Sequence, residues 1–152
     1  MLLTQKAIAE GSLSLGMECN RLYDLVHVTD GAENQKHFLL LEILKTILNT
    51  SSSEQGTRSA ALAIQTLGGY GYTTDFPVQQ LYRDIRIMSL YEGTTGIQSL
   101  DLLGRKITME NGRALQLLSE TIEDTITRAS EYKELQSYSS LLKTELIRIA
   151  AN

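Results

Sequence analysis

Apolar residues recur along this chain at the spacing of helical turns, and not in the alternation typical of β-strands. The first stripe consists of Leu3, Ala7, Ile8, Leu15, Leu22, Leu25 and Val26. Apolar positions three and four residues apart form one face of an α-helix. Glycine is favoured just after the last turn of a helix, so Gly31 is expected to cap this one. The pattern therefore predicts a first helix over residues 2 to about 29.

The next apolar stripe leaves two interpretations open. Phe38, Leu41, Leu44, Ile47 and Leu48 form it, and a helical run from Ala60 to Ile64 follows and ends at Gly68-Gly69. Residues 49–56 lie between these runs and contain three consecutive serines and a glycine, which by propensity alone indicate a loop. Because tertiary packing often overrides propensity, one long helix through the serines is the other interpretation.

Local signals predict the remaining elements. Residues 68–75 are expected to form a loop, and Pro77 suits the first turn of a helix over roughly residues 77–89 because its missing N–H would be unpaired there anyway. Thr94 or Thr95 can cap a helix that extends to Lys106. Two further stripes consist of Ala114, Leu115, Leu118, Ile122, Ile126 and Ala129, and of Leu135, Tyr138, Leu142, Leu146 and Ile149. Weak junctions are expected at Asn111-Gly112 and Ser137.

Composition agrees with an all-α fold, an up-and-down helical bundle. The chain has 152 residues, a length that suggests one domain, and 42% of them are hydrophobic. It contains one proline and no long valine-rich alternation, so little in it favours sheet.

Charge and cysteine content exclude several classes of function. The net charge of −4 arises from 14 basic and 18 acidic residues that are scattered along the chain, so no basic stripe offers a site for nucleic acid or an anionic membrane. No apolar run approaches the roughly 20 residues of a membrane span, and the first residues lack a signal-peptide pattern. Cys19 is the single cysteine, which excludes an intramolecular disulfide, fits a reducing compartment and predicts a buried core thiol.

Common catalytic and metal motifs are absent from the sequence. His27 and His37 have no acid at metal-ligand spacing, and no Glu-x-x-His pair occurs, so no metal site is predicted. The glycine-rich run Gly68 to Tyr72 lacks the Gly-Lys-Ser/Thr ending of a phosphate-binding loop and follows a helix. From its chemistry alone this run favours a tight turn between helices over a ligand cradle.

Glu92 is the candidate for acid–base chemistry. It lies in a predicted turn between two helices and precedes Gly93-Thr94, where exposed backbone N–H groups could meet a ligand carbonyl. Its neighbours Ile87, Met88, Leu90 and Tyr91 are apolar, and poor hydration would raise the pKa of the carboxyl toward neutrality. The alternative interpretation is an ordinary solvated acid on a loop.

Four motifs in order resemble the C-terminal helical domain of the FAD-dependent acyl-CoA dehydrogenases. Residues 62–72, LAIQTLGGYGY, are similar to the end of a helix and a flavin-contacting loop in that family, and residues 76–87 are similar to its next helix. Tyr91-Glu92-Gly93-Thr94 is similar to the segment with the catalytic glutamate. Residues 97–106, IQSLDLLGRK, resemble a longer subgroup that carries a helical C-terminal extension.

The resemblance implies a division of the chain. Residues 1–106 correspond to the family's C-terminal helical bundle without its first helix, and residues 107–152 to the helical extension, which we expect to be incomplete. It also favours one long second helix through the serines. The family's N-terminal helical domain and its β-domain have no counterpart here.

The activity implied by the resemblance is α,β-dehydrogenation of an acyl-CoA thioester. Glu92 would remove the pro-R α-proton while the β-hydrogen leaves as hydride to FAD, and the backbone N–H of Glu92 with a flavin hydroxyl would polarise the thioester carbonyl. Tyr91 and Gly93 would line the acyl-thioester site, and Thr94 would contact the FAD of the same subunit. The residues implied to contact FAD across a subunit interface are Gln65, Thr66, Leu67, Gly68 and Gly69.

The resemblance also implies partners and a compartment. An electron-transfer flavoprotein would accept the electrons, and the parent enzyme would be a homo-oligomer, a dimer or a tetramer, in the bacterial cytoplasm or in the mitochondrial matrix of a eukaryote. Arg83, Asp84 and Arg86 are expected to form interface or intramolecular ion pairs. The isolated chain is expected to be inactive and without FAD. The alternatives are a non-catalytic helical interaction or oligomerisation module derived from the family, and a relative of the acyl-CoA oxidases.

Overall fold

The computed structural model describes residues 1–91 and 93–150, and this part of the chain consists of helices and short connections, without β-strands. The all-α prediction is therefore confirmed. The α-helices are α1 (Leu2–Val28), α2 (Gly31–Leu67), α3 (Val78–Arg86), α4 (Thr95–Asp101), α5 (Arg113–Ser130) and α6 (Gln136–Ala150). Shorter turns are the 3₁₀ segments η1 (Gly68–Tyr72), η2 (Ile87–Ser89) and η4 (Lys133–Leu135) and the π-helical turn η3 (Leu102–Lys106).

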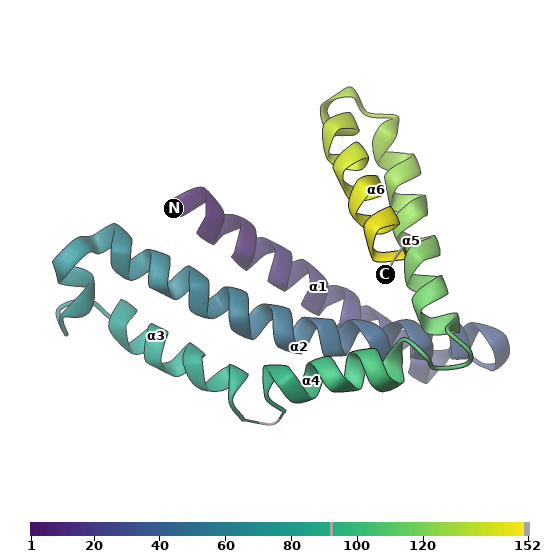
Figure 1. Ribbon diagram of the computed structural model, residues 1–152, viewed down its shortest axis with the longest axis horizontal. Coiled ribbons are helices and arrows are strands. Elements are labelled where there is room, and N and C mark those ends of the chain that lie inside the picture. The colour runs from purple at the N-terminus through teal and green to yellow at the C-terminus, as the bar shows by residue number, and fades with distance from the viewer. Residues whose placement is uncertain (92, 151–152) are drawn as a thin grey trace.

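The helix α2 is the central element of the fold. Its 37 residues correspond to about 55 Å at the rise of an α-helix. In Figure 1, α1 runs antiparallel along α2, and α3 and α4 follow one another along it. The helices α5 and α6 form a hairpin that rises from one end of this layer. The other elements are therefore positioned mainly by their contacts with α2.

The main core cluster lies where α1, α2 and α5 meet. It contains the buried side chains Leu22, Leu39, Leu40, Ala114 and Leu117, with Leu41, Leu44, Met109 and Leu118 packed against them. Cys19 is also buried, as expected. Burial, together with the negative charge of Glu18, raises the pKa of the Cys19 thiol, which keeps it protonated and weakly nucleophilic.

The serine-rich stretch of α2 is helical, so the loop predicted from propensity is wrong and the continuous helix is confirmed. The Ser53 hydroxyl donates a 2.9 Å hydrogen bond to the Asn49 carbonyl one turn earlier, and Thr57 does the same to Ser53. Both hydroxyls are thus satisfied within the helix. Gly56 has a packing reason, because a Cβ there would lie 2.9 Å from Cδ1 of Ile85, so glycine allows α3 to approach closely.

Gly31 does not cap α1, contrary to the prediction. The helix ends at Val28, and the backbone N–H of Thr29 donates to the Leu25 carbonyl at 3.0 Å. The Asn34 amide donates to the carbonyls of Val26 and Thr29, at 2.6 and 2.9 Å. These hydrogen bonds satisfy carbonyl groups at the end of α1 without a glycine. Gly31 instead begins α2 at a φ of +63°.

Two other connections differ from the predictions. Residues 68–75, expected to be a loop, begin with the 3₁₀ turn η1. A Cβ on Gly71 would lie 2.6 Å from the Ile64 carbonyl oxygen, so only glycine lets this turn fold back onto α2. Ser137 lies inside α6, and the junction falls earlier because η4 precedes that helix. The junction at Asn111-Gly112 is confirmed, with left-handed φ values of +57° and +87°.

Candidate functional site

The candidate site lies around the connection between η2 and α4. Glu92, the predicted base, lies outside the described residues. On its N-terminal side the backbone N–H groups of Leu90 and Tyr91 both donate to the Ile87 carbonyl, at 2.9 and 3.2 Å. Arg86 also donates to the hydroxyl of Ser89, which is buried. The chain is therefore held in a defined turn up to Tyr91.

Gly93 and Thr94 define the other side of the connection. Gly93 has a φ of +102°, and a Cβ there would lie 2.5 Å from Nε2 of Gln98. The positive φ favours glycine at this position, and a larger residue would also displace the Gln98 amide. The Thr94 hydroxyl accepts a 3.3 Å hydrogen bond from the Ile97 N–H, so Thr94, one of the two predicted candidates, is the N-cap of α4.

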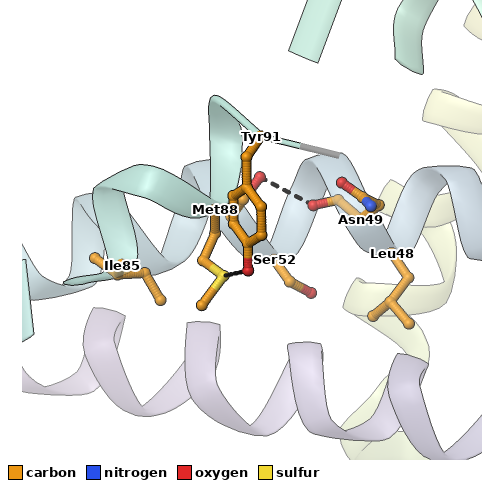
Figure 2. Close-up of a pocket in the computed structure, with 7 residues that line it drawn as sticks. Leu48, Asn49, Ser52, Ile85, Met88 and Tyr91 are labelled. Atoms are coloured by element: carbon orange, nitrogen blue, oxygen red, sulfur yellow. Dashed lines mark hydrogen bonds between the residues drawn. The ribbon is translucent and has the colours of Figure 1, made fainter. Parts of the chain in front are cut away.

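A cavity of about 400 Å³ lies beside Tyr91 (Figure 2). Leu48, Ile85 and Met88 supply its apolar walls, and Asn49, Ser52 and Ser53 of α2 supply its polar ones. The Tyr91 hydroxyl donates to the sulfur of Met88 at 3.1 Å. The Ser52 hydroxyl oxygen is buried and has no hydrogen-bond partner among the described residues. The sequence indicated Met88 only as an apolar neighbour of the predicted base and offered no signal for Ser52 at this site.

The apolar neighbours of the predicted base are more exposed than the sequence led us to expect. Ile87, Met88, Leu90 and Tyr91 expose between 44% and 55% of their surface. The expectation of poorly hydrated surroundings is therefore not met by the described residues. Strong dehydration of this segment requires a surface that these residues do not supply.

The predicted flavin-contacting residues are exposed and lie where α2 ends and η1 begins: Gln65, Thr66 and Leu67 in α2, and Gly68 and Gly69 in η1. The Thr66 hydroxyl is already engaged within the chain, since it donates to the Leu62 carbonyl at 2.7 Å and accepts from the Gln5 amide at 3.5 Å. The Gln65 amide has no side-chain partner within the described part of the chain. Gly68 has a φ of +61°, where glycine is favoured.

This end of α2 is distant from the Tyr91–Thr94 segment. The Thr95 hydroxyl donates a 2.5 Å hydrogen bond to Glu54 of α2. Gln65 lies eleven residues further along α2, which corresponds to roughly 17 Å. The structure therefore brings Tyr91, Gly93 and Thr94 together but separates them from Gln65–Gly69.

Sequence reasoning missed a buried ion pair beyond α4. Lys106 is 1% exposed, and its ammonium pairs with Glu42 of α2, which also pairs with Lys45. Burial alone would raise the pKa of Glu42, but the hydrogen bonds from Lys106 and Lys45 outweigh it and lower that pKa. Lysine is rarely buried, so its place at the end of an apolar stripe gave no signal of this role.

Among the described residues, the charged residues of α3 do not form the intramolecular ion pairs that were one of the two expectations, and the interface pairs remain a prediction. Asp84 accepts a 2.7 Å hydrogen bond from Gln80, and Arg86 donates to Ser89 as described above. Neither of them, nor Arg83, forms an ion pair within the part of the chain that the structure describes. Over the same residues no group of three or more His, Cys, Asp or Glu side chains could hold a metal ion, and no helix is long and apolar enough to cross a membrane.

Comparisons with known proteins identify the family. Residues 15–107 match the sequence profile of the family described as "Acyl-CoA dehydrogenase, C-terminal domain". This chain therefore belongs to the acyl-CoA dehydrogenase family, in the region of its C-terminal domain. The resemblance seen in the motifs is thus confirmed.

Individual relatives agree with that family. The chain is 33% identical over 147 residues to the broad-specificity linear acyl-CoA dehydrogenase FadE5 of Mycobacterium tuberculosis, which covers 95% of the chain and 24% of the relative. It is 34% identical over 125 residues to the 3-methylmercaptopropionyl-CoA dehydrogenase of Ruegeria pomeroyi, with 82% and 21% covered. It is 40% identical over 72 residues to the human mitochondrial short-chain specific acyl-CoA dehydrogenase, with 47% and 17% covered. The chain spans about a quarter or less of the length of these relatives.

Proposed function

We propose that this chain is the C-terminal helical portion of a flavin-dependent acyl-CoA dehydrogenase. The enzyme would carry out α,β-dehydrogenation of an acyl-CoA thioester, with Glu92 as the base that removes the α-proton. The observation that carries the proposal is the family match over residues 15–107, which includes the Tyr91–Thr94 segment. A bacterial enzyme of this kind would act in the cytoplasm, and a eukaryotic one in the mitochondrial matrix.

The surroundings of Tyr91 support a role in substrate binding. The cavity beside it has walls of Leu48, Ile85 and Met88, which suit a hydrocarbon group. Gly93 lies on the other side of the predicted base without a side chain of its own, and the Gln98 amide lies beside it. We assign Tyr91 and Gly93 to the acyl-thioester site.

The proposed proton transfer depends on how the thioester is held. An α-proton is weakly acidic, so the thioester carbonyl must be polarised as Glu92 removes it, and the backbone N–H of Glu92 is the proposed donor from this chain. FAD, when bound, would accept the β-hydrogen as hydride. An electron-transfer flavoprotein would then receive the electrons.

The residues assigned to FAD form two groups with different properties. Thr94 accepts the Ile97 N–H, so its own hydroxyl hydrogen is left to donate to an FAD oxygen. The C-terminal end of α2 carries partial negative charge. The pyrophosphate of a bound FAD would therefore need hydrogen-bond donors there, such as the Gln65 amide. Leu67 and Gly68-Gly69 offer an exposed apolar and unobstructed surface beside it, while Thr66 contributes backbone.

The separation of the two groups supports a shared flavin site. Gln65–Gly69 lie roughly 17 Å along α2 from the part that contacts Thr95. We propose that one copy of the chain contacts one FAD through Thr94 and a second FAD, bound to another subunit, through Gln65–Gly69. The enzyme would accordingly be a homo-oligomer, a dimer or a tetramer.

The isolated chain is expected to be inactive. The apolar residues around the predicted base are exposed, and the surfaces that would dehydrate the base and hold the flavin belong to other parts of the proposed enzyme. Purified chain should therefore show no flavin absorbance at near-equimolar ratio. Co-purification of stoichiometric FAD with this chain alone would contradict the proposal.

Glu92→Gln in the longer enzyme tests the assignment of the base. The variant should lose dehydrogenation by about 10²–10⁴-fold and still bind acyl-CoA, because an amide of similar shape cannot remove the proton. Turnover is measured with an artificial electron acceptor and binding by titration. Glu131→Gln, an exposed acid at the end of α5, is the matched control and should leave both unchanged. If Glu92→Gln retained full turnover, the base would lie elsewhere.

The second candidate is a non-catalytic helical interaction module. The observation that favours it is the apolar surface of α6, where Leu141, Ile147 and Ile149 are 60–65% exposed. The reading frame upstream of Met1 discriminates between the two candidates. A frame that continues into flavin-domain sequence supports the enzyme, and a stop codon directly upstream supports the module.

A further inference from the structure

The helix α4 and the turn η3 are attached to α2 at both of their ends. Near the beginning of α4, the Thr95 hydroxyl donates to Glu54 at 2.5 Å. At the end of η3, Lys106 pairs with Glu42. The two carboxylates are twelve positions apart on α2, and their partners are eleven positions apart on the neighbouring segment. Each interval corresponds to roughly 17 Å, so the two pairs are in matching antiparallel register.

The contact at Lys106 is the more buried of the two. Lys106 is 1% exposed, and Glu42 is 8% exposed. A buried ammonium requires a partner, and Glu42 is the carboxylate that meets it. A slip of α4 along α2 would leave this charge unpaired. The ion pair therefore specifies one position of α4 on α2.

Gln98 links this ion pair to the predicted active-site segment. A polar cavity of about 530 Å³ is lined by Glu42, Lys106 and Gln98, among others. The Gln98 side chain extends from this cavity to Gly93, where a Cβ would lie 2.5 Å from its Nε2. Its backbone N–H also donates to the Thr94 carbonyl at 2.9 Å. A displacement of α4 would thus move both Gly93 and Thr94.

We propose that Glu42, Glu54, Thr95 and Lys106 form a clamp that sets the position of the Gly93-Thr94 segment along α2. Lys106 and Thr95 are positioning residues that act through Thr94 and do not touch the substrate. The structural part of this proposal is independent of the reaction. Its catalytic consequence, that the clamp positions Glu92 for proton removal, rests on the proposed function.

Amide hydrogen exchange in the chain itself tests the clamp. Lys106→Met removes the ammonium but keeps much of the apolar volume, and Thr95→Val removes the hydroxyl but keeps the shape. In both variants the amides of Ile97 and Gln98, which bond to Thr94, should exchange about tenfold faster or more relative to the Leu22 amide in the core. Thr95→Ser, which keeps the hydroxyl, should retain the original rates.

Two controls separate positioning from general stability. Arg105→Met removes an exposed ion pair with Asp101 one residue from Lys106 and should leave the relative rates unchanged. Leu117→Ala weakens the core away from the clamp and should accelerate the amides of Ile97 and Leu22 together. If Lys106→Met does not fold, Thr95→Val carries the test alone. Equal acceleration of all amides in the clamp variants, or none, would overturn the proposal.

Turnover in the longer enzyme tests the catalytic consequence. Lys106→Met and Thr95→Val should each lower kcat about tenfold while KM changes less than twofold, because misplacement of the base acts on the chemical step. The exchange rates test the clamp independently of the turnover measured for Glu92→Gln. If Glu92→Gln retains turnover, the proposed function fails and the exchange rates still decide the clamp. If Glu92→Gln is inactive but the rates do not change, the clamp alone is wrong.

Discussion

The beginning and the end of the α5–α6 hairpin differ in how they meet the rest of the molecule. Ala114 and Leu117, in the first turns of α5, are 0% and 3% exposed in the core shared with α1 and α2. In α6, Tyr138, Leu142 and Ile149 of the predicted stripe are 42–68% exposed. Both helices carry apolar stripes, yet only one of these stripes is covered to this extent. Helical spacing thus indicates which face is apolar, but it does not indicate whether that face has a partner within the chain.

The comparisons with relatives differ in whether they include this hairpin. The family profile ends at residue 107, before α5, whereas the match to the M. tuberculosis relative covers 95% of the chain. The hairpin is therefore shared with that relative although it lies beyond the family profile. Substitutions at its buried beginning and at its exposed end are therefore expected to change the free energy of unfolding by different amounts.

Removing the buried contact at the beginning of the hairpin should have the largest effect. Leu117→Ala should lower the free energy of unfolding by about 2–5 kcal/mol, because it leaves a cavity among Leu22, Leu39 and Leu40. Leu141→Ala makes the same change at a side chain that is 65% exposed and should change stability by less than about 0.5 kcal/mol. Urea unfolding measures the free energy of unfolding of both variants. Equal losses would contradict the difference in packing between the two ends of the hairpin.

A smaller effect is expected where Glu42 pairs with Lys106, just before the hairpin. The pKa of Glu42 is lowered in the folded chain, so its contribution is present above the unfolded pKa of about 4.3 and is lost as the pH falls through the folded value. Glu42→Gln should therefore reduce stability by about 1–3 kcal/mol at pH 7, and the difference from the original chain should shrink below about pH 4.

Unfolding measured at pH 7 and pH 3 checks that dependence. Glu134→Gln changes an exposed acid in η4 and is the matched control, which should alter stability little at either pH. A difference for Glu42→Gln that stayed the same at both pH values would contradict the assigned role of the carboxylate.

The smallest effect on stability is expected at the exposed end of the hairpin. Leu141→Lys should change the free energy of unfolding by less than about 0.5 kcal/mol, because Leu141 is 65% exposed. It should also reduce the binding of a hydrophobic dye such as ANS, since it interrupts the apolar surface of α6. Titration of ANS fluorescence measures this, and a large loss of stability would show that Leu141 is packed.

The fold was largely predictable from spacing and from the family motifs. Leu3, Leu22 and Leu25 mark α1, and Pro77 marks the turn before α3. The serine-rich stretch misled propensity because Ser53 and Thr57 bond to carbonyls of their own helix, and because Gly56 allows contact with Ile85. These compensations depend on neighbours in space, which a local pattern does not contain.

The candidate site was predictable only in part. The sequence predicted a turn at Gly93 and a cap at Thr94 or Thr95, and the structure gives Gly93 a φ of +102° and makes Thr94 the N-cap of α4. The pairing of Lys106 with Glu42 could not be read from the sequence, since the two residues are 64 positions apart. The roles of Glu92 and of Gln65–Gly69 remain predictions of the family resemblance.

The length of α2 has a consequence for insertions and deletions. Glu42, Glu54 and Gln65 all stand on this one uninterrupted helix, and each inserted residue would turn everything after it by about 100° and advance it by about 1.5 Å. A single insertion between Glu54 and Gln65 would thus turn the Gln65 side chain to another face of α2, while α4 kept its place. Differences in length among relatives should therefore fall in the short connections at residues 73–76 and 107–112, and α2 should keep its residue count.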